Sequence, residues 1–218
     1  MAKLVWDESG KRLYETGVEK GVLYVQGENG QYQNGVAWNG LTAVTESPSG
    51  AEPTALYADD IKYLELFSAE EFGATIEAYT YPAEFEACDG SASLGEGVTI
   101  GQQDRKAFGL CYRTIVGNDV KGNENGYKLH LIYGAKAKPS EKAYATVNDS
   151  PEAVTFSWEV TTTPVNVAGF KPTASVTIDS TKIQPDKLKL IEDKLYGTAE
   201  AEATLPLPDE IKQIITGA

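Results

Sequence analysis

"GATIEAYTYP", residues 73–82, alternates between two sets of side chains over its whole length. A two-residue period is the pattern of a β-strand whose two faces meet different surroundings. Ile76 is therefore expected to face a core, and Glu77 is expected to face water. The stretch predicts a sheet protein that carries carboxylates on one side of its strands.

Seven further segments have the same character, with β-branched and aromatic residues between Gly, Asn and Pro. They are residues 22–27, 35–47, 57–66, 106–117, 127–137, 153–165 and 173–179. With residues 73–82 they predict a mainly β fold of about eight strands. Asn125-Gly126 predicts the turn of a β-hairpin, because both residues tolerate positive φ.

Helical patterns are few. Pro185 opens a stretch in which Leu188, Ile191 and Leu195 recur on one helical face, and Gly197 ends it. We expect this helix to cover an edge or a face of the sheet. A second short helix is predicted from Pro208. Ser68 to Glu71 fits a capping box, but the β-rich run that follows limits any helix there to about one turn.

The chain has 218 residues and no apolar run long enough to span a membrane. Its first residues lack the apolar region and the cleavage site of a secretory signal, so we expect synthesis and assembly in a cytoplasm. The length allows one sizeable core or two small ones. Cys88 and Cys111 are expected to be buried thiols rather than a disulfide framework.

The formal charge of −13 is concentrated in one part of the chain. Residues 46–96 hold twelve acidic residues and one basic residue, Lys62, which gives a local charge of −11. Apolar residues interleave with these acids, which argues against disorder. The charge excludes a surface that grips nucleic acid by displacing counterions from its phosphates.

Two segments are expected to be long loops, residues 45–55 and residues 88–105. Both are rich in turn-forming residues, and both exceed the usual length of a hairpin connection. Long loops often carry function.

Motifs for catalysis or metal binding are weak. The single histidine, His130, lies in an alternating strand and is expected to be a packing residue or a satisfied polar residue. No G-x-S-x-G or Cys-x-x-Cys motif is present. A calcium site at Asp59 and Asp60 or within residues 118–126 lacks the usual spacing. Paired carboxylates beside aromatic residues leave a glycosidase as the strongest enzymatic alternative. We expect no catalytic residue, no cofactor and no metal.

Several stretches, in order and spacing, resemble the major tail protein, or tail tube protein, of long-tailed non-contractile bacteriophages of Gram-positive hosts. They are "VAWNGLTAVTESPSGAEPTALYADDIKYLEL", "GATIEAYTYPAEFEACDG", "GQQDRKAFGLCYRTIVGND" and "AVTFSWEVTTTPV". The resemblance covers residues 1–200, which we expect to be a tail tube β domain. Residues 201–218 are left as a C-terminal arm.

The resemblance implies a β-sandwich or barrel-like fold with one flanking helix and a long inter-strand loop. In this family, six copies of the chain close a ring through sheet pairing between subunits, and the rings stack into a virion tube that conducts double-stranded DNA. The implied partners are further copies of the chain, the tape measure protein, and the tail terminator and distal tail proteins, with no membrane.

A lumen lined with carboxylates would repel DNA phosphates. The candidate lumen acids are Glu77, Asp59, Asp60, Glu65, Glu84 and Glu86. The candidate contact between rings is the first long loop, with Thr45, Glu46, Ser47, Pro48, Ser49, Gly50, Ala51, Glu52 and Pro53. The acids could instead serve only the solubility of an outer surface.

Two other functional classes remain as alternatives. A secreted or surface adhesive β domain would show the same strand pattern. A glycan-acting enzyme of the tail tip would combine acidic and aromatic residues in a cleft.

Overall fold

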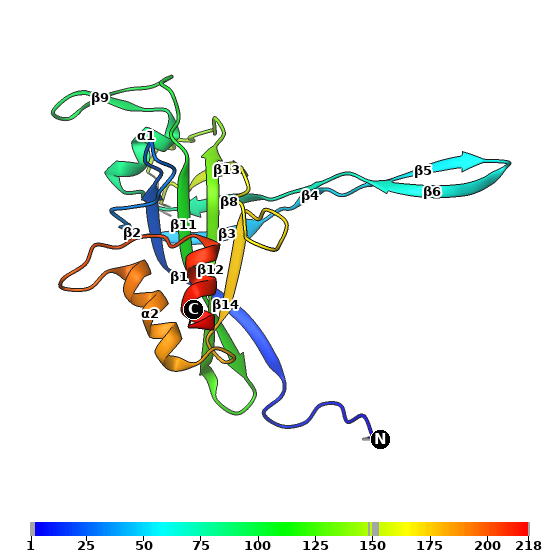
Figure 1. The fold of residues 1–218 in the computed structure, drawn as a ribbon. Helices are drawn as coiled ribbons and strands as arrows, with labels where there is room; N and C mark the ends of the chain where they lie inside the picture. Colours follow the sequence, from blue (N-terminus) through cyan, green and yellow to red (C-terminus); the bar gives the residue numbers. More distant parts are fainter. Residues whose placement is uncertain (1–2, 148, 150–152, 218) are drawn as a thin grey trace.

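A computed structural model describes residues 3–147, 149 and 153–217. Strands make up 45% of the structure and helices 13%, so the predicted mainly β class is confirmed. One antiparallel sheet forms the body (Figure 1). Its strands are β1 (Leu13–Val25), β2 (Val36–Trp38), β3 (Leu41–Glu46), β8 (Gly73–Ala78), β11 (Phe108–Asn118), β12 (Gly122–Ala137), β13 (Phe156–Thr162) and β14 (Ser175–Asp179).

The strand order is β2-β1-β11-β12-β13-β8-β3, with β14 as an additional partner of β12. β12 pairs with β14 through Lys128–Ile132 and with β13 through Ala135–Ala137. Gly134 lies between the two ladders with φ +60°, and a Cβ there would come 2.2 Å from the backbone oxygen of Thr163. A residue without a side chain is therefore required where β12 changes partner.

The central strands are buried on both faces. Leu23 of β1 joins one hydrophobic core, and its neighbours Val22 and Tyr24 join the other. The strand period of two explains this division. The first core includes Trp38, Ile76, Phe85, Phe108, Leu110, Ile132 and Trp158, and the second includes Tyr32, Leu129, Leu131, Tyr133, Ile178, Leu188, Ile191, Leu195 and Ile211.

The first core is closed by a short helical segment, η1 (Ala83–Phe85) followed by α1 (Glu86–Asp89). The ring of Phe85 is fully buried and lies edge-on to Trp158. Asp89, also buried, accepts hydrogen bonds from the Trp158 indole at 3.1 Å and from Lys142 Nζ at 2.5 Å. This carboxylate ties the segment after β12 to the core.

The second core is covered by α2 (Pro185–Tyr196) and α3 (Pro208–Thr216). Both helices begin at a proline, as the sequence predicts. The C-terminal arm lies on the chain's own body: Leu205 and Ile211 are buried, and the Tyr133 hydroxyl donates to the backbone oxygen of Pro206 at 2.8 Å.

The sheet is sandwich-like and does not close into a barrel. Its two end strands, β2 and β3, are consecutive in the chain and joined by Asn39 and Gly40. The sheet therefore curls until its ends meet at this turn. Among the described residues, no ladder joins β3 to β1 or β2, so the barrel-like alternative is not realised.

Two local expectations are wrong. The turn between β11 and β12 lies at residues 119–121, and Gly126 is paired with Val116 inside the ladder. Asn118 sets the turn, because its buried side chain accepts hydrogen bonds from the backbone of Val120 and Lys121. Residues 88–105 are not an open loop, since they contain the hairpin of β9 (Ala92–Gly95) and β10 (Val98–Ile100).

Cys88 and Cys111 are free and buried, as expected. Burial raises the pKa of each thiol to about 12. Among the described residues, no helix has the length and apolar character needed to cross a membrane.

Replacing Gly134 with Ala should lower the free energy of unfolding by about 2–4 kcal/mol, because the new Cβ meets backbone in a left-handed conformation. Urea unfolding followed by circular dichroism measures the change. Gly101→Ala is the matched control, since no atom lies within 4 Å of the Cβ it would add. Equal stabilities of the two variants would contradict this account of the partner switch.

Candidate assembly surface

A narrow two-stranded arm projects from the sheet between β3 and β8 (Figure 1). Its strands are β4 (Ser49–Gly50), β5 (Pro53–Ala58), β6 (Ile61–Phe67) and β7 (Glu70–Glu71). β4 pairs with β7, and β5 pairs with β6. We call residues 47–72 the arm.

The arm corrects three sequence expectations. Residues 45–55 are not a loop but the end of β3 and one side of the arm, while residues 57–66 are two strands instead of one. Ser68 to Glu71 is not a helical turn, because Glu70 and Glu71 pair with β4. Of these three segments, only residues 57–66 are correctly predicted to be extended, and the hairpin that they form with residues 53–56 is not predicted.

The tip of the arm is the pair Asp59 and Asp60, with φ 51° and 62°. Two successive residues with positive φ make a two-residue hairpin turn whose twist matches that of the strands. Aspartate tolerates this conformation better than most residues. The Asp-Asp pair between apolar runs was therefore the available signal, although it is weaker than Asn-Gly.

The ladder of the arm sorts its side chains onto two faces. Leu56 lies opposite Leu64, and Thr54 lies opposite Leu66. Directly paired residues share a face, and so do residues two apart on one strand, except at the register shift between Leu56 and Tyr57, where β6 has one additional residue. One face is therefore apolar along its length. We call it the leucine face, and it consists of Thr54, Leu56, Ala58, Ile61, Leu64 and Leu66.

The other face is mixed. Ala55 lies opposite Glu65, and Tyr57 lies opposite Lys62. Lys62 and Glu65 form an ion pair on this side. Pro53 and Phe67 complete it nearer the body. The two faces of the arm therefore differ in polarity, although both are surrounded by solvent in the single chain.

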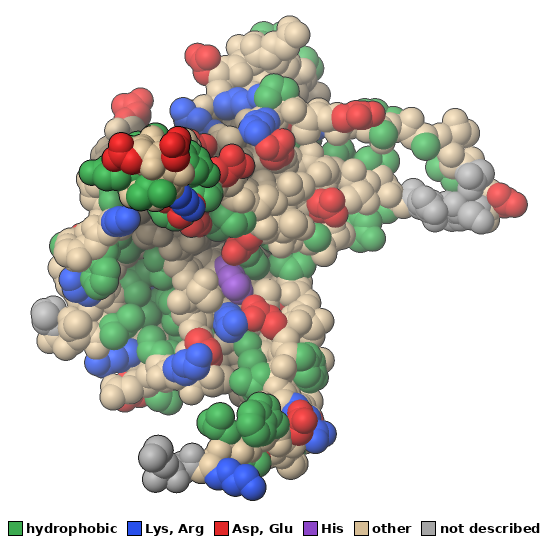
Figure 2. Space-filling model, turned by 90° about the vertical axis from the view of Figure 1, so that its right-hand side faces the viewer, with side chains coloured by type: hydrophobic (Ala, Val, Ile, Leu, Met, Phe, Trp, Pro, Cys, Tyr) green, Lys and Arg blue, Asp and Glu red, His purple; other side chains and the backbone are tan. Residues whose placement is uncertain are grey.

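Apart from Phe72 at its root, the large apolar side chains of the arm belong to neither core. On the leucine face, Leu66 is 55% exposed and Ile61 is 64% exposed, and on the remainder of the arm Tyr57 is 72% exposed. Figure 2 shows hydrophobic side chains beside acidic ones on the side toward which the arm projects. An apolar surface of this kind usually marks an interaction site.

The root of the arm is held firmly. The amide of Ser47 donates to the oxygen of Gly73 at 2.8 Å, and the Thr162 hydroxyl donates to the oxygen of Phe72 at 2.6 Å. The ring of Phe72 packs against the first core. The arm therefore begins from a fixed position on the sheet.

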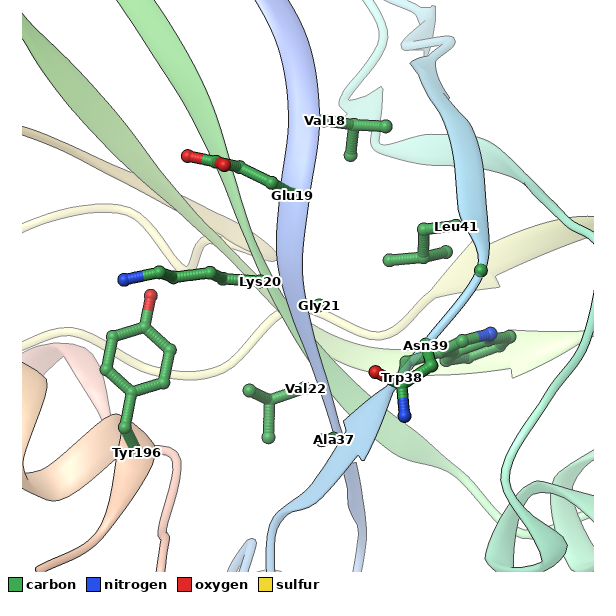
Figure 3. Close-up of a pocket in the computed structure, with 11 residues that line it drawn as sticks. Val18, Glu19, Lys20, Gly21, Val22, Ala37, Trp38, Asn39, Leu41 and Tyr196 are labelled. Atoms are coloured by element: carbon green, nitrogen blue, oxygen red, sulfur yellow. The ribbon is translucent and has the colours of Figure 1, made fainter. Parts of the chain in front are cut away.

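Several strand edges of the body are unpaired among the described residues, and those of β3 and of the first part of β1 lie near each other. β3 pairs only with β8, and Leu13–Lys20 of β1 pairs only with β11. A cleft of about 480 Å³ lies beside β1 where these edges diverge, lined by Val18, Lys20 and Leu41 among others (Figure 3). Unpaired edges are templates for pairing with another chain.

The candidate lumen acids fall into two groups. Asp59, Asp60 and Glu65 lie on the arm, whereas Glu77 lies on β8 and Glu84 and Glu86 lie in η1 and α1. Ile76 is buried, and Glu77, on the other face of β8, is half-buried beside Ser157 and Ala43. The structure therefore does not gather the six carboxylates into one site.

No group of three or more His, Cys, Asp or Glu side chains is positioned to hold a metal ion in the described part of the chain. Comparison with protein-family models found no match, and neither did a search of curated proteins.

Replacing residues 49–71 with Asn-Gly should leave the body folded. Residues 49–71 contribute nothing to either core, and a two-residue turn fits the ladder that it would close. We expect the free energy of unfolding to change by less than about 1 kcal/mol, as is usual for changes outside the core. Circular dichroism and urea unfolding measure this.

Trp158→Ala serves as the comparison, because loss of a fully buried indole should cost about 3–5 kcal/mol. If excision of the arm destabilised the chain as much as this core substitution, the arm would be part of the folding unit and not a surface for association.

Proposed function

We propose that the chain is a structural subunit that assembles with further copies of itself into stacked rings, as in the tail tube of a long-tailed bacteriophage. The observation that carries this proposal is the arm, whose leucine face has no cover within the single chain. A second copy of the chain is the proposed cover. The unpaired edges of β1 and β3 supply the further contacts that a closed ring needs.

The size of the apolar surface fits assembly that depends on concentration. Full burial of a Leu or Ile side chain contributes about 1.5–3 kcal/mol, and roughly half of each is already covered on the leucine face. Its four large side chains therefore offer about 4 kcal/mol, which only reaches the lower end of the cost of association. One docked arm is insufficient, so several contacts must form together.

The geometry also favours stacking over a closed pair. An arm that docks on a different surface of its neighbour makes a heterologous contact, which can repeat along an axis. Edge pairing can close within a ring while the arms join one ring to the next. We therefore propose a soluble subunit that polymerises at high concentration or on a tape measure and tail-tip scaffold.

The acidic surface supports a passive role toward DNA. Glu77 lies on the polar face of β8, beside the open edge of β3. Pairing of a neighbour at that edge would continue this face into the next subunit. We propose that Glu77 contributes to the wall of the channel, where carboxylates keep phosphates from binding.

Sedimentation velocity over a concentration series, with electron microscopy of the same samples, tests assembly. The unaltered chain should form tubes with a central channel as concentration rises. Leu66→Asp should remain monomeric, because it places a carboxylate on the leucine face. Lys62→Gln makes the same change of one unit in net charge on the opposite face and should still assemble.

A chain that stays monomeric at every concentration, even with its proposed scaffold proteins, would overturn the proposal. Binding of the monomer to a glycan surface would favour the adhesive domain, and turnover of a glycan substrate would favour the enzyme.

Glu77→Lys should convert the channel into a DNA-binding surface without preventing tube formation. Each new cation can replace a counterion on a phosphate, so binding of double-stranded DNA to assembled tubes should weaken steeply as salt is raised. Electrophoretic retardation and microscopy measure binding and assembly separately.

Glu77→Gln removes the charge without adding a cation and should bind DNA weakly or not at all. If tubes of Glu77→Lys did not bind DNA at low salt, Glu77 would have to lie outside the channel.

A further inference from the structure

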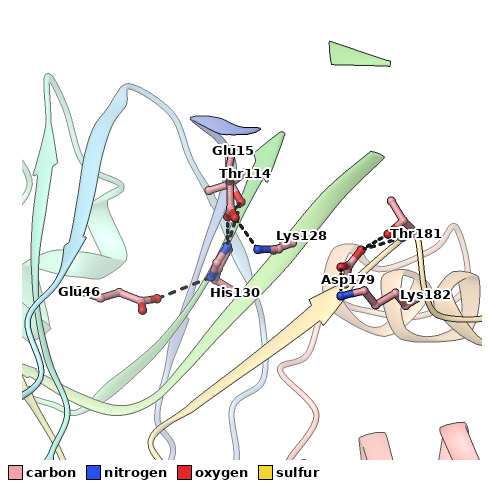
Figure 4. Close-up of polar contacts among 8 residues, drawn as sticks. All are labelled: Glu15, Glu46, Thr114, Lys128, His130, Asp179, Thr181 and Lys182. Carbon is pink, nitrogen blue, oxygen red and sulfur yellow. Dashed lines mark hydrogen bonds and ion pairs between the residues drawn. The ribbon is translucent and has the colours of Figure 1, made fainter. Parts of the chain in front are cut away.

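The single histidine lies between two carboxylates that come from different parts of the sheet (Figure 4). His130 Nε2 is 3.4 Å from Glu15 Oε1, and its Nδ1 is 3.6 Å from Glu46 Oε1. Its ring stacks on Tyr112 with centroids 4.7 Å apart, and its side chain is only 13% exposed. The sequence predicts a packing or a satisfied polar position for His130, and the ring makes both a stacking contact and polar contacts.

The hydrogen bonds define which nitrogen carries the proton of the neutral ring. Thr114 Oγ1 lies 2.5 Å from Glu15 Oε1 and 2.9 Å from His130 Nε2. The hydroxyl has one hydrogen, which an ionised carboxylate takes. Nε2 must then donate to the hydroxyl oxygen, so the neutral ring has a bare Nδ1.

That bare nitrogen faces an acceptor. Nδ1 is buried without a hydrogen-bond partner, and the group nearest to it in this contact is the Glu46 carboxylate. Two acceptors that face each other make an unfavourable contact. A second proton on Nδ1 would turn it into a donor toward Glu46 and would add attraction to both carboxylates.

The other charged and titratable groups around the ring are already engaged. Lys128 of β12 forms an ion pair with Glu15 at 2.5 Å, and the Tyr112 hydroxyl of β11 donates to Glu46 at 2.7 Å. Partial burial opposes ionisation of Glu15, but hydrogen bonds from Lys128 and Thr114 outweigh it and hold the pKa of this carboxyl below its usual value. On β14, Asp179 is bound by Thr181 and Lys182, and Thr177 is the residue paired with His130.

Glu46 has a special position, because it is the last residue of β3 and directly precedes the arm. β3 is an edge strand with one partner, whereas His130 lies in the central strand β12. The contacts of Glu46 with Tyr112 and His130 therefore cross the bend of the sheet and hold the root of the arm against its centre.

We propose that protonation of His130 strengthens this link in mildly acidic solution and so adds to the hydrogen bonds that hold the root of the arm. Imidazole is the side chain whose ordinary charge change falls between about pH 5 and 8. A fixed root loses less conformational freedom when the arm docks, which should favour association. This consequence rests on the proposed assembly, whereas the link itself is a property of the single chain.

The first test uses the dilute monomer. As the chain has one histidine, a proton NMR titration reports His130 without further assignment. Glu46→Gln should remove the response of the Ser47 amide chemical shift to protonation of His130, because it removes the carboxylate that joins the ring to the root of the arm. Glu159→Gln, on the neighbouring strand β13 and paired with Lys138, is the matched control and should leave this response in place.

The second test measures the root directly. Hydrogen exchange, corrected for the intrinsic effect of pH, should show protection of the Ser47 amide about two- to fivefold higher at about pH 5.5 than at about pH 8, the size expected for partly exposed ion pairs. His130→Gln keeps a polar side chain that does not titrate, so this difference should vanish.

The hydrogen-exchange protection of the Ser47 amide in the monomer decides the proposal. A pH dependence that persists in His130→Gln, or is missing from the unaltered chain, overturns it. If protection of the Ser47 amide depends on pH in the unaltered chain but not in His130→Gln, the link is supported, even if no tubes form at any pH. Absence of tubes would count against the proposed function alone. Where tubes form, the concentration needed should fall at acidic pH in the unaltered chain and much less in His130→Gln.

Discussion

The fold depends on one long strand, β12, that changes its pairing partner along one of its two edges. β12 pairs with β11 along one side, and on its other side it pairs first with β14 and then with β13. The change of partner requires backbone to approach backbone at Gly134. Because β12 turns away from β14 there, the sheet bends over itself and encloses one core, while its opposite face remains available to the two C-terminal helices.

This arrangement buries most of the large apolar side chains of the central strands. Central strands send alternate residues to the two cores, and Trp158, Phe85 and Trp38 fill one while Tyr24, Tyr133 and Ile191 fill the other. The leucine face of the arm has no place in either. An apolar ladder held out from a complete body is more easily explained by a partner than by folding, which is why association forms the basis of the proposed function.

The bend also brings together residues that the chain keeps far apart. Glu46 at the root of the arm meets Tyr112 and His130 only because the edge strand β3 curls toward the central strands. The same curl leaves the edges of β1 and β3 open instead of joining them in a barrel. A surface for association and a polar contact that could regulate it thus arise from one feature of the sheet.

The sequence by itself determined the β class, the two helices that begin at Pro185 and Pro208, and the burial of Ile76 with Glu77 on the opposite face. These features follow from local periodicity and from proline, which act over a few residues. The continuous β-propensity of residues 57–66 predicts one strand. Only the pairing of β5 with β6 shows that the chain reverses direction at Asp59 and Asp60. Tertiary structure alone decided that Asn118 makes the turn after β11, that the arm is left without cover, and that His130 lies between Glu15 and Glu46. Each of these depends on which strands become neighbours, and strand pairing joins residues whose separation along the chain carries no local signal.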